Sequence, residues 1–128
     1  MGEKSTFKKE KGLRKAIDKT LASKILRTVH NHEGFYFYNA LGVYTGKSAM
    51  SVKDFVKMLQ ILDVQSVDFH FSRGDFRRWT QFILGDVELS IRINQIPQDT
   101  RGEKLRSALI KNVNERIGEL KIRRIGNF

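Results

Sequence analysis

The chain of 128 residues contains no cysteine, only one proline and no long apolar run. The absence of cysteine excludes disulfides, thiolate metal ligands and thiol nucleophiles, and it is typical of a protein in a reducing compartment. The longest stretch without a charged side chain is residues 34–46, which is too short to cross a membrane. Residues 1–15 carry charges that no apolar segment follows, so a secretory signal is not predicted. We therefore expect a cytoplasmic protein outside the membrane.

Positive charge is abundant, and it is concentrated at the two ends of the chain. Residues 1–28 contain nine Lys or Arg against three Asp or Glu, and residues 101–128 contain eight against three. The 72 residues between them contain seven against eight, whereas the whole chain has a net charge of +10. A near-neutral middle with two basic ends favours a polyanionic partner. The same charge would also keep a protein without such a partner soluble, because like-charged molecules repel one another.

Both ends of the chain are predicted to contain amphipathic helices. Apolar residues four apart predict one helix over 13–28, after a flexible basic segment over 1–12, and another over 101–121. Residues 122–128 are expected to form a loose basic tail, and 13–121 a single domain. The apolar residues that mark these helices are Leu13, Ile17, Leu21, Ile25 and Val29, and Leu105, Leu109, Val113, Ile117 and Leu120.

Short polar pairs predict where three helices begin, since a Ser or Thr followed three residues later by an acid can cap a helix. The pairs are Ser51 with Asp54, Ser72 with Asp75, and Thr100 with Glu103. The first pair predicts a helix over 52–62, and the second a helix that ends near Gly85. The third begins the C-terminal helix.

Two strands are predicted in the middle of the chain. Four aromatic residues over 35–38 favour the first strand, and alternating apolar residues over 66–71 favour the second. Gly42 and Gly46 indicate a loop between the first strand and the next helix. Residues 86–96 remain ambiguous, because their alternation is typical of a strand whereas Asp86 is a good helix cap.

The middle of the chain resembles an uncharacterised archaeal domain family of unknown function, over roughly residues 35–117. The motifs that carry the resemblance are Phe35-Tyr36-Phe37-Tyr38, Thr45-Gly46-Lys47-Ser48-Ala49, Val67-Asp68-Phe69-His70, Arg73 through Trp79, Leu84-Gly85-Asp86, and Leu105-Arg106. The resemblance implies an α+β fold, mainly helical, with a small sheet of two or three strands and basic terminal helices. It favours a helix over 86–96 and implies no chemistry. Some relatives look to be attached to carbohydrate-active enzymes.

No set of residues forms a convincing catalytic or metal site. Asp68 and His70 could form the acid–base pair of a hydrolase or transferase on one face of a strand, but Ser66 and Ser72 are possible nucleophiles by position only. His30 and His32 lie two residues apart in a polar turn, and no third ligand is near in sequence. We therefore assign no catalytic residue, no metal and no cofactor, and we expect no enzymatic activity.

The residues expected to contact nucleic acid are basic side chains, most of them near the two ends. They are Lys8, Lys11, Lys15, Lys19, Lys47, Arg77, Arg78, Arg116, Lys121, Arg123 and Arg124. Lys47 follows a glycine-rich segment that lacks the spacing of a phosphate-binding loop, and it is expected to make a looser anion contact. Tyr36 and Tyr38 could face outwards and stack on bases, with Phe35 and Phe37 in the core.

The sequence favours a small non-enzymatic RNA-binding protein, associated with the ribosome or another ribonucleoprotein, that binds by neutralising phosphates. RNA is preferred to DNA because no DNA-reading motif is evident and flexible basic ends often become ordered on folded RNA. The alternative is a protein-interaction or regulatory module linked to carbohydrate-active enzymes. The sequence decides neither the oligomeric state nor whether the two basic ends share one surface.

Overall fold

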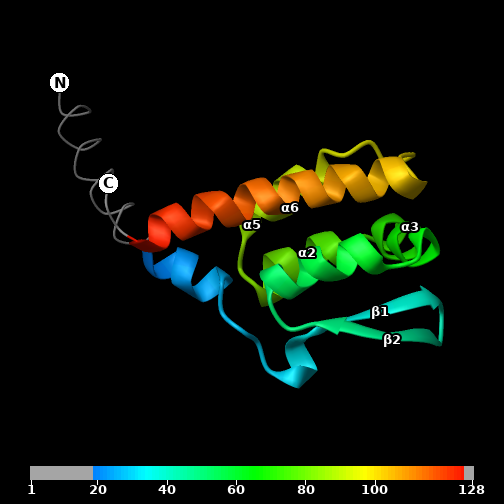
Figure 1. The fold of residues 1–128 in the computed structure, drawn as a ribbon, viewed down its shortest axis with the longest axis horizontal. Helices are drawn as coiled ribbons and strands as arrows, with labels where there is room; N and C mark the ends of the chain where they lie inside the picture. The colour runs from blue at the N-terminus through cyan, green and yellow to red at the C-terminus, as the bar shows by residue number, and fades with distance from the viewer. Residues whose placement is uncertain (1–18, 126–128) are drawn as a thin grey trace.

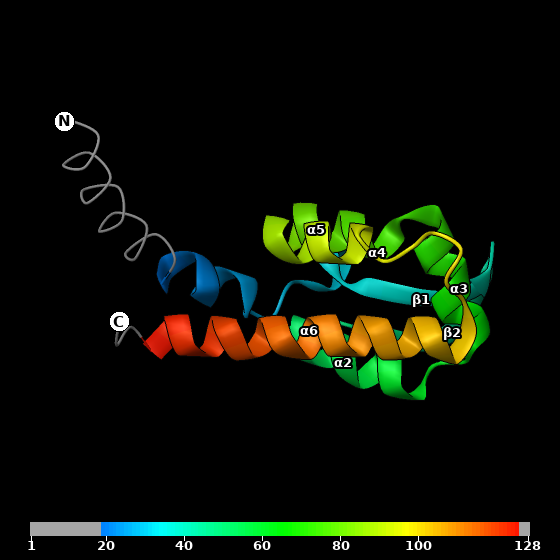
Figure 2. The same cartoon turned by 90° about the horizontal axis from the view of Figure 1, so that it is seen from above.

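The computed structural model describes residues 19–125, in which a β-hairpin packs against one side of a group of helices (Figure 1). The elements in chain order are a helix over 19–25, η1 (Asn31–Glu33), β1 (Phe35–Ala40), β2 (Val43–Ala49), α2 (Val52–Ile61), α3 (Val64–Arg73), α4 (Asp75–Arg78), η2 (Trp79–Ile83), α5 (Val87–Asn94) and α6 (Gly102–Ile125). α2 packs on β2 and α3 on β1, while α6 packs against both helices. α5 packs beside α6, as the view from above shows (Figure 2). This is the predicted α+β fold, mainly helical with a two-stranded sheet.

The long helix α6 contributes a continuous apolar stripe to the core. Its buried residues, from Leu105 to Leu120, are the series that the sequence predicted. α6 continues to Ile125, so residues 122–125 are helical rather than part of a loose tail. It begins at Gly102, whose N–H donates to the side chain of Asp68 (2.8 Å). The helix thus begins one residue after the predicted start at 101, and the side chain that accepts at its N-terminus is Asp68 rather than the predicted cap Thr100.

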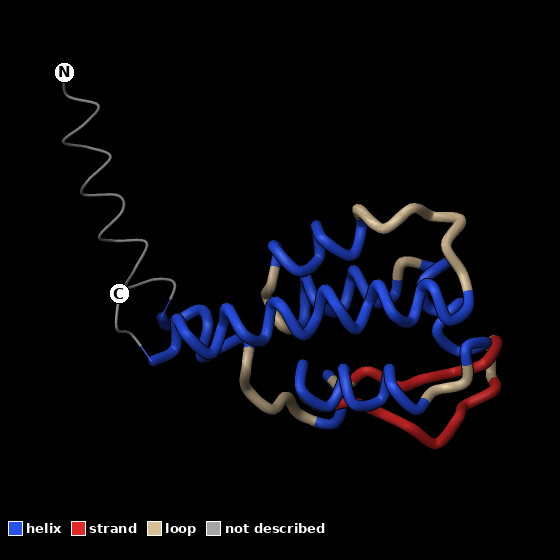
Figure 3. Tube along the Cα trace, turned by 45° about the horizontal axis from the view of Figure 1, so that its top comes forward, coloured by secondary structure: helices blue, strands red, loops and turns tan. Residues whose placement is uncertain are grey.

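The hairpin contains a strand that the sequence did not predict. β2 occupies most of the segment expected to be a loop, and it pairs antiparallel with β1 (Figure 3). Gly42, at a φ of 74°, forms the turn, because left-handed backbone is accessible to glycine at little cost. Thr45 Oγ1 donates to the carbonyl oxygen of Phe37 at 2.7 Å, and the pairing is irregular on both sides of Tyr38. Pairing with β1 thus stabilises a strand in a segment whose glycines predicted a loop.

The predicted second strand, 66–71, is wrong, because these residues lie in α3. Asp63 caps the helix by accepting from the N–H of Gln65 (3.2 Å), and Gly74 ends it with a φ of 75°. Val67 and Phe71 are four residues apart and both buried, which fits a helix as well as a strand. The two caps and the packing on β1 stabilise the helix over the strand.

Ser72 does not cap the next helix, because it still belongs to α3 and its Oγ donates to the carbonyl oxygen of Phe69 (3.0 Å). The chain turns at Gly74, and α4 continues into a π-helical turn, η2. Asp86 caps α5 by accepting from the N–H of Leu89 (3.2 Å), so residues 87–94 are helical, as the family resemblance implied. The Ser51 cap of α2 is also confirmed, since its Oγ accepts from the N–H of Asp54 (3.1 Å).

The two described ends of the chain lie side by side. The helix over 19–25 runs beside the last turns of α6 in both perpendicular views (Figures 1 and 2). Ala22 and Ile25 are buried, as are Ile117 and Leu120 of α6. The predicted helix over 13–28 is therefore present from residue 19 to 25, and its first part lies outside the described residues.

Candidate functional site

Five exposed basic residues belong to the two segments that lie side by side at the described ends of the chain. We call this surface the basic end; it consists of Lys19, Lys24, Lys121, Arg123 and Arg124. The first two belong to the helix over 19–25 and the other three to the last turns of α6, which lie side by side (Figure 1). The structure thus brings together four of the predicted contact residues and adds Lys24. Lys8, Lys11 and Lys15 lie outside the described residues.

Lysines and arginines differ in their partners. Each of the ion pairs found within residues 19–125 uses an arginine or His70, and none uses a lysine. Of the eight lysines in this range, all except the half-buried Lys47 are exposed. Most carboxylates in this range accept from arginines, from His70 or from backbone N–H groups, whereas Glu33, Asp99 and Glu115 form no ion pair here. No lysine charge is therefore neutralised by a direct ion pair within residues 19–125.

Arg116 is a correction to the predicted interface, because its side chain is held inside the fold. Its guanidinium lies 2.9 Å from Asp86 and 3.1 Å from Glu119, and the two members of the Arg116–Asp86 pair are 11% and 1% exposed. Burial alone would lower the pKa of Arg116, but its hydrogen bonds and attraction to the two carboxylates outweigh burial and raise it. Arg92 extends the network to Glu119 (2.8 Å). This network ties α5 to α6 and leaves Arg116 little surface for a ligand.

The other predicted basic residues lie apart from the basic end. Lys47 is half-buried and lies on β2, and the looser anion contact expected of it stays a prediction. Arg77 and Arg78 belong to α4. Arg78 donates through Nη2 to Asp75 at 2.6 Å, whereas no ion pair is found for Arg77 within the described chain.

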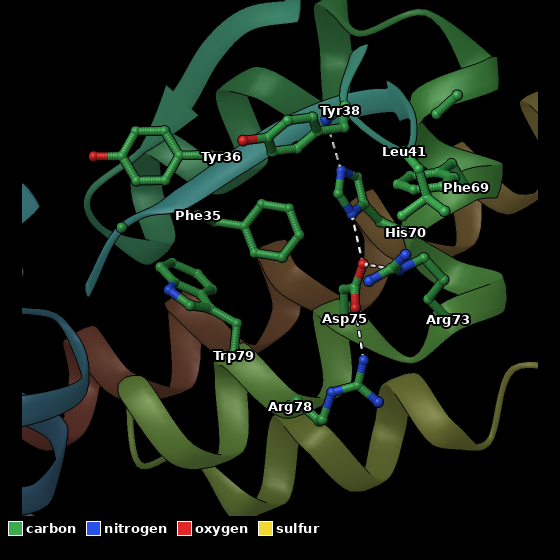
Figure 4. A pocket seen from close by; sticks show the side chains of 13 residues that line it. Phe35, Tyr36, Tyr38, Leu41, Phe69, His70, Arg73, Asp75, Arg78 and Trp79 are labelled. Carbon is green, nitrogen blue, oxygen red and sulfur yellow. Dashed lines mark hydrogen bonds and ion pairs between the residues drawn. The ribbon is translucent and has the colours of Figure 1, made fainter. Parts of the chain in front are cut away.

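A cleft of about 500 Å³ lies between the hairpin and the α3–α4 turn (Figure 4). Tyr36 and Tyr38 of β1, the two tyrosines predicted to face outwards, line one wall; Tyr36 is exposed and Tyr38 is half-buried. Trp79 of η2 and Phe69 of α3 also line the cleft. Tyr44, which was not among the predicted contact residues, packs its ring against Tyr36 and Tyr38 at centroid distances of 6.0 and 5.3 Å.

His70 is part of the cleft wall, and both of its ring nitrogens are engaged. The backbone N–H of Tyr38 donates to Nε2 (2.8 Å), so Nε2 carries no proton, and Nδ1 must donate to Asp75 (2.8 Å). Burial lowers the pKa of His70, and the attraction of Asp75 offsets this only in part. The imidazole is therefore neutral near pH 7 and links β1 to the α3–α4 turn.

The pair considered for acid–base chemistry does not form. Asp68 and His70 lie on a helix rather than on one face of a strand, and Asp68 accepts from the N–H of Gly102 at the start of α6. The carboxylate beside His70 is Asp75, which was predicted only to take part in a helix cap. Within residues 19–125, no three His, Asp or Glu side chains gather to hold a metal ion. No helix in this range has the length and apolar character of a membrane span.

Fold and surface thus define a small basic α+β domain with an aromatic cleft. The chain belongs to a family of unknown function, DUF5752, whose model matches residues 4–114. The match includes the N-terminal basic segment, which the resemblance over 35–117 left out, and it ends before Arg116. Neither a curated protein nor a solved structure matches the chain.

Proposed function

We propose that this protein binds RNA, alone or within a ribonucleoprotein such as the ribosome, through phosphate contacts at the basic end. The observation that carries the proposal is that the helix over 19–25 runs beside the last turns of α6 (Figure 2). The first segment contains Lys19 and Lys24, and the second contains Lys121 and Arg124. Cations from both ends would then act on one stretch of backbone. A cytoplasmic location is part of the proposal.

The lysines suit this role because they are exposed and carry no ion pair within residues 19–125. Each cation that neutralises a phosphate releases counterions, so affinity falls with salt by a log–log slope of about 0.7 per phosphate for single-stranded nucleic acid. Electrostatic binding of this kind needs no catalytic group. The proposal is for a binding protein rather than an enzyme, and the full engagement of His70 supports it, since a general base needs a free nitrogen.

The test is a titration of RNA at several salt concentrations with two variants that each lose four charges. One changes the basic end: Lys19→Gln, Lys24→Gln, Lys121→Gln and Arg124→Gln. The matched control changes four exposed lysines of α2 and α6: Lys53→Gln, Lys57→Gln, Lys104→Gln and Lys111→Gln. We expect the basic-end variant to lose up to about 3 from the slope, and the control to lose less than about 1.

Two results would contradict the proposal. If the wild-type protein does not bind RNA, or binds it without a dependence on salt, RNA binding by phosphate neutralisation is wrong. If both variants lose slope equally, net charge matters and the basic end does not. Duplex DNA of the same length, titrated in parallel, should bind no more tightly than RNA.

A protein-interaction module is the second candidate, and exposed apolar side chains favour it. Phe82 at the end of η2 is 70% exposed, and Val87 and Ile91 lie four residues apart on α5 and are also exposed. These side chains could contact a partner protein, in line with the alternative of a module that works with carbohydrate-active enzymes. A pull-down with nuclease treatment separates the candidates: partners that resist nuclease and are lost in Phe82→Ser favour this second role.

A further inference from the structure

The cleft beside the hairpin combines aromatic walls with two arginines at its rim (Figure 4). Its volume of about 500 Å³ falls within the range of small-ligand sites. Tyr36 is 36% exposed, and its hydroxyl donates to the carbonyl oxygen of Asn31 (2.6 Å), which fixes the ring. Trp79 Nε1 likewise donates to the carbonyl oxygen of Glu33 (2.8 Å). The aromatic surface is therefore held in place before any ligand arrives.

The carboxylate of Asp75 positions Arg73 and Arg78, but it accepts only one hydrogen bond from each guanidinium. Arg73 Nε and Arg78 Nη2 donate to different oxygens of Asp75, at 3.0 and 2.6 Å. Within the described chain, no hydrogen bond is found for the two Nη atoms of Arg73 or for Nε and Nη1 of Arg78. The guanidinium of Arg73 also lies over the ring of Phe69, 5.0 Å from its centroid. The two side chains are 45% and 48% exposed, so several oriented donors remain for a ligand.

The charge of this cluster favours an anion. Two arginines face one carboxylate, and His70 is neutral because its Nε2 accepts a hydrogen bond. The cluster therefore carries a net charge of +1. Arginine donors in a planar fork match the oxygens of a phosphate group.

We propose that the cleft binds one unpaired nucleotide of RNA, with its base on the aromatic wall and its phosphate at Arg73 and Arg78. A flat base fits the exposed ring of Tyr36 and the half-buried ring of Tyr38, next to the buried Trp79, since stacking on aromatic side chains is how single-stranded nucleic acid is commonly held. A base inside a duplex has both faces covered by its neighbours, so the cleft selects single strands. A purely apolar peptide would leave the arginine donors unused, and inorganic phosphate would leave the aromatic wall uncovered. This inference rests on the proposed function, because it assigns one part of the bound RNA to a second surface.

Trp79 provides a direct probe, because it lines the cleft and is the only tryptophan in the sequence. We would titrate the full chain with a single-stranded oligoribonucleotide, the same sequence as a duplex, and a free mononucleotide, while following both Trp79 emission and affinity. The single strand should quench Trp79, and the duplex should bind without quenching it. The mononucleotide should quench only at much higher concentration, since it lacks the contacts of the basic end.

Two variants test the two halves of the cleft, and a third is the control. Tyr38→Leu removes a stacking surface, and Arg73→Gln with Arg78→Gln removes the donors at the rim. The control, Arg101→Gln, removes an exposed arginine that lies over the ring of Phe71 (5.9 Å) and does not line the cleft. We expect Tyr38→Leu to bind the single strand roughly tenfold more weakly. The arginine variant should lose Trp79 quenching and about 0.7 of the salt slope. Circular dichroism establishes that each variant is folded, and Tyr38→Leu retains the contacts of Asp75.

The outcomes separate this inference from the proposed function. Quenching that disappears in both cleft variants but not in Arg101→Gln supports the inference. If RNA binds with its salt dependence but Trp79 emission is unchanged and the cleft variants behave like the control, the inference is wrong and the proposed function stands. If RNA does not bind but the mononucleotide quenches Trp79, the cleft is a site for a free nucleotide, and both are wrong. If neither the single strand nor the mononucleotide quenches Trp79, the inference is also wrong.

Discussion

Replacement of Arg116 by methionine should destabilise the fold strongly and leave RNA binding almost unchanged. The side chains of Arg116 and Asp86 are 11% and 1% exposed and form an ion pair. Removal of the arginine therefore leaves the buried carboxylate of Asp86 without its counter-charge. Within the described residues, the N–H of Leu89 would then be the one donor that still binds the Asp86 carboxylate. Breaking a buried pair in this way costs about 3–5 kcal/mol. Such a loss is a large share of the 5–15 kcal/mol that typically stabilises a domain.

Chemical denaturation followed by circular dichroism measures this loss. Asp86→Asn, combined with Arg116→Met, should recover much of the stability, because the asparagine retains a helix cap without a buried charge. Below the denaturation range, the affinity of Arg116→Met for RNA should lie within about twofold of wild type, whereas Lys121→Gln should lower the salt slope by about 0.7. A variant that loses less than about 1 kcal/mol of stability but loses RNA affinity would refute the assignment of Arg116 to the core.

Further predictions concern His70, Gly74 and the core stripe of α6. The pKa of His70 is lowered from 6.5 in the fold, so the unfolded chain binds the proton first as the pH falls below about 6.5. The free energy of unfolding therefore decreases as the pH falls below about 6.5, by at most about 1.4 kcal/mol per pH unit from this group. Urea titrations at pH 7.5 and 5.5 should show a smaller decrease for His70→Gln than for the wild type. Gly74→Ala should cost about 1–2 kcal/mol, because the residue has a φ of 75°; a neutral effect on the melting temperature would show that the turn tolerates a side chain. Leu109→Ala, at a fully buried position of α6, should cost about 2–5 kcal/mol in the same assay.

Local sequence signals predicted the elements whose stability depends on local contacts. The four-residue spacing from Leu105 to Leu120 predicted the buried face of α6, and Ser51 predicted the start of α2. β2 was missed because its strand geometry depends on pairing with β1, which a glycine-rich segment does not indicate. α3 was mistaken for a strand because Val67, Phe69 and Phe71 alternate. The spacing cannot reveal that Phe69 instead faces the cleft.

The candidate site was predicted in part, and its missing pieces depend on tertiary contacts. Charge counting found the basic ends, but it could not distinguish Arg116, which is half-buried and paired with the buried Asp86, from the exposed Lys121. Tyr36 and Tyr38 were expected to face outwards, whereas the cleft also requires Arg73 and Asp75 from a different element. Arg73 precedes a glycine that reverses the chain, and this was the one available signal for a corner there. A chain reversal brings side chains together that sequence spacing keeps apart.

The most direct test of the central claim is the reactivity of each lysine towards an acetylating reagent, with and without a single-stranded oligoribonucleotide. Seven of the eight described lysines are exposed, so each reports whether RNA covers its part of the surface. We predict protection of Lys19, Lys24 and Lys121, with Lys53, Lys57, Lys104 and Lys111 still reactive. Protection of the latter four, with the basic end still reactive, would contradict the account.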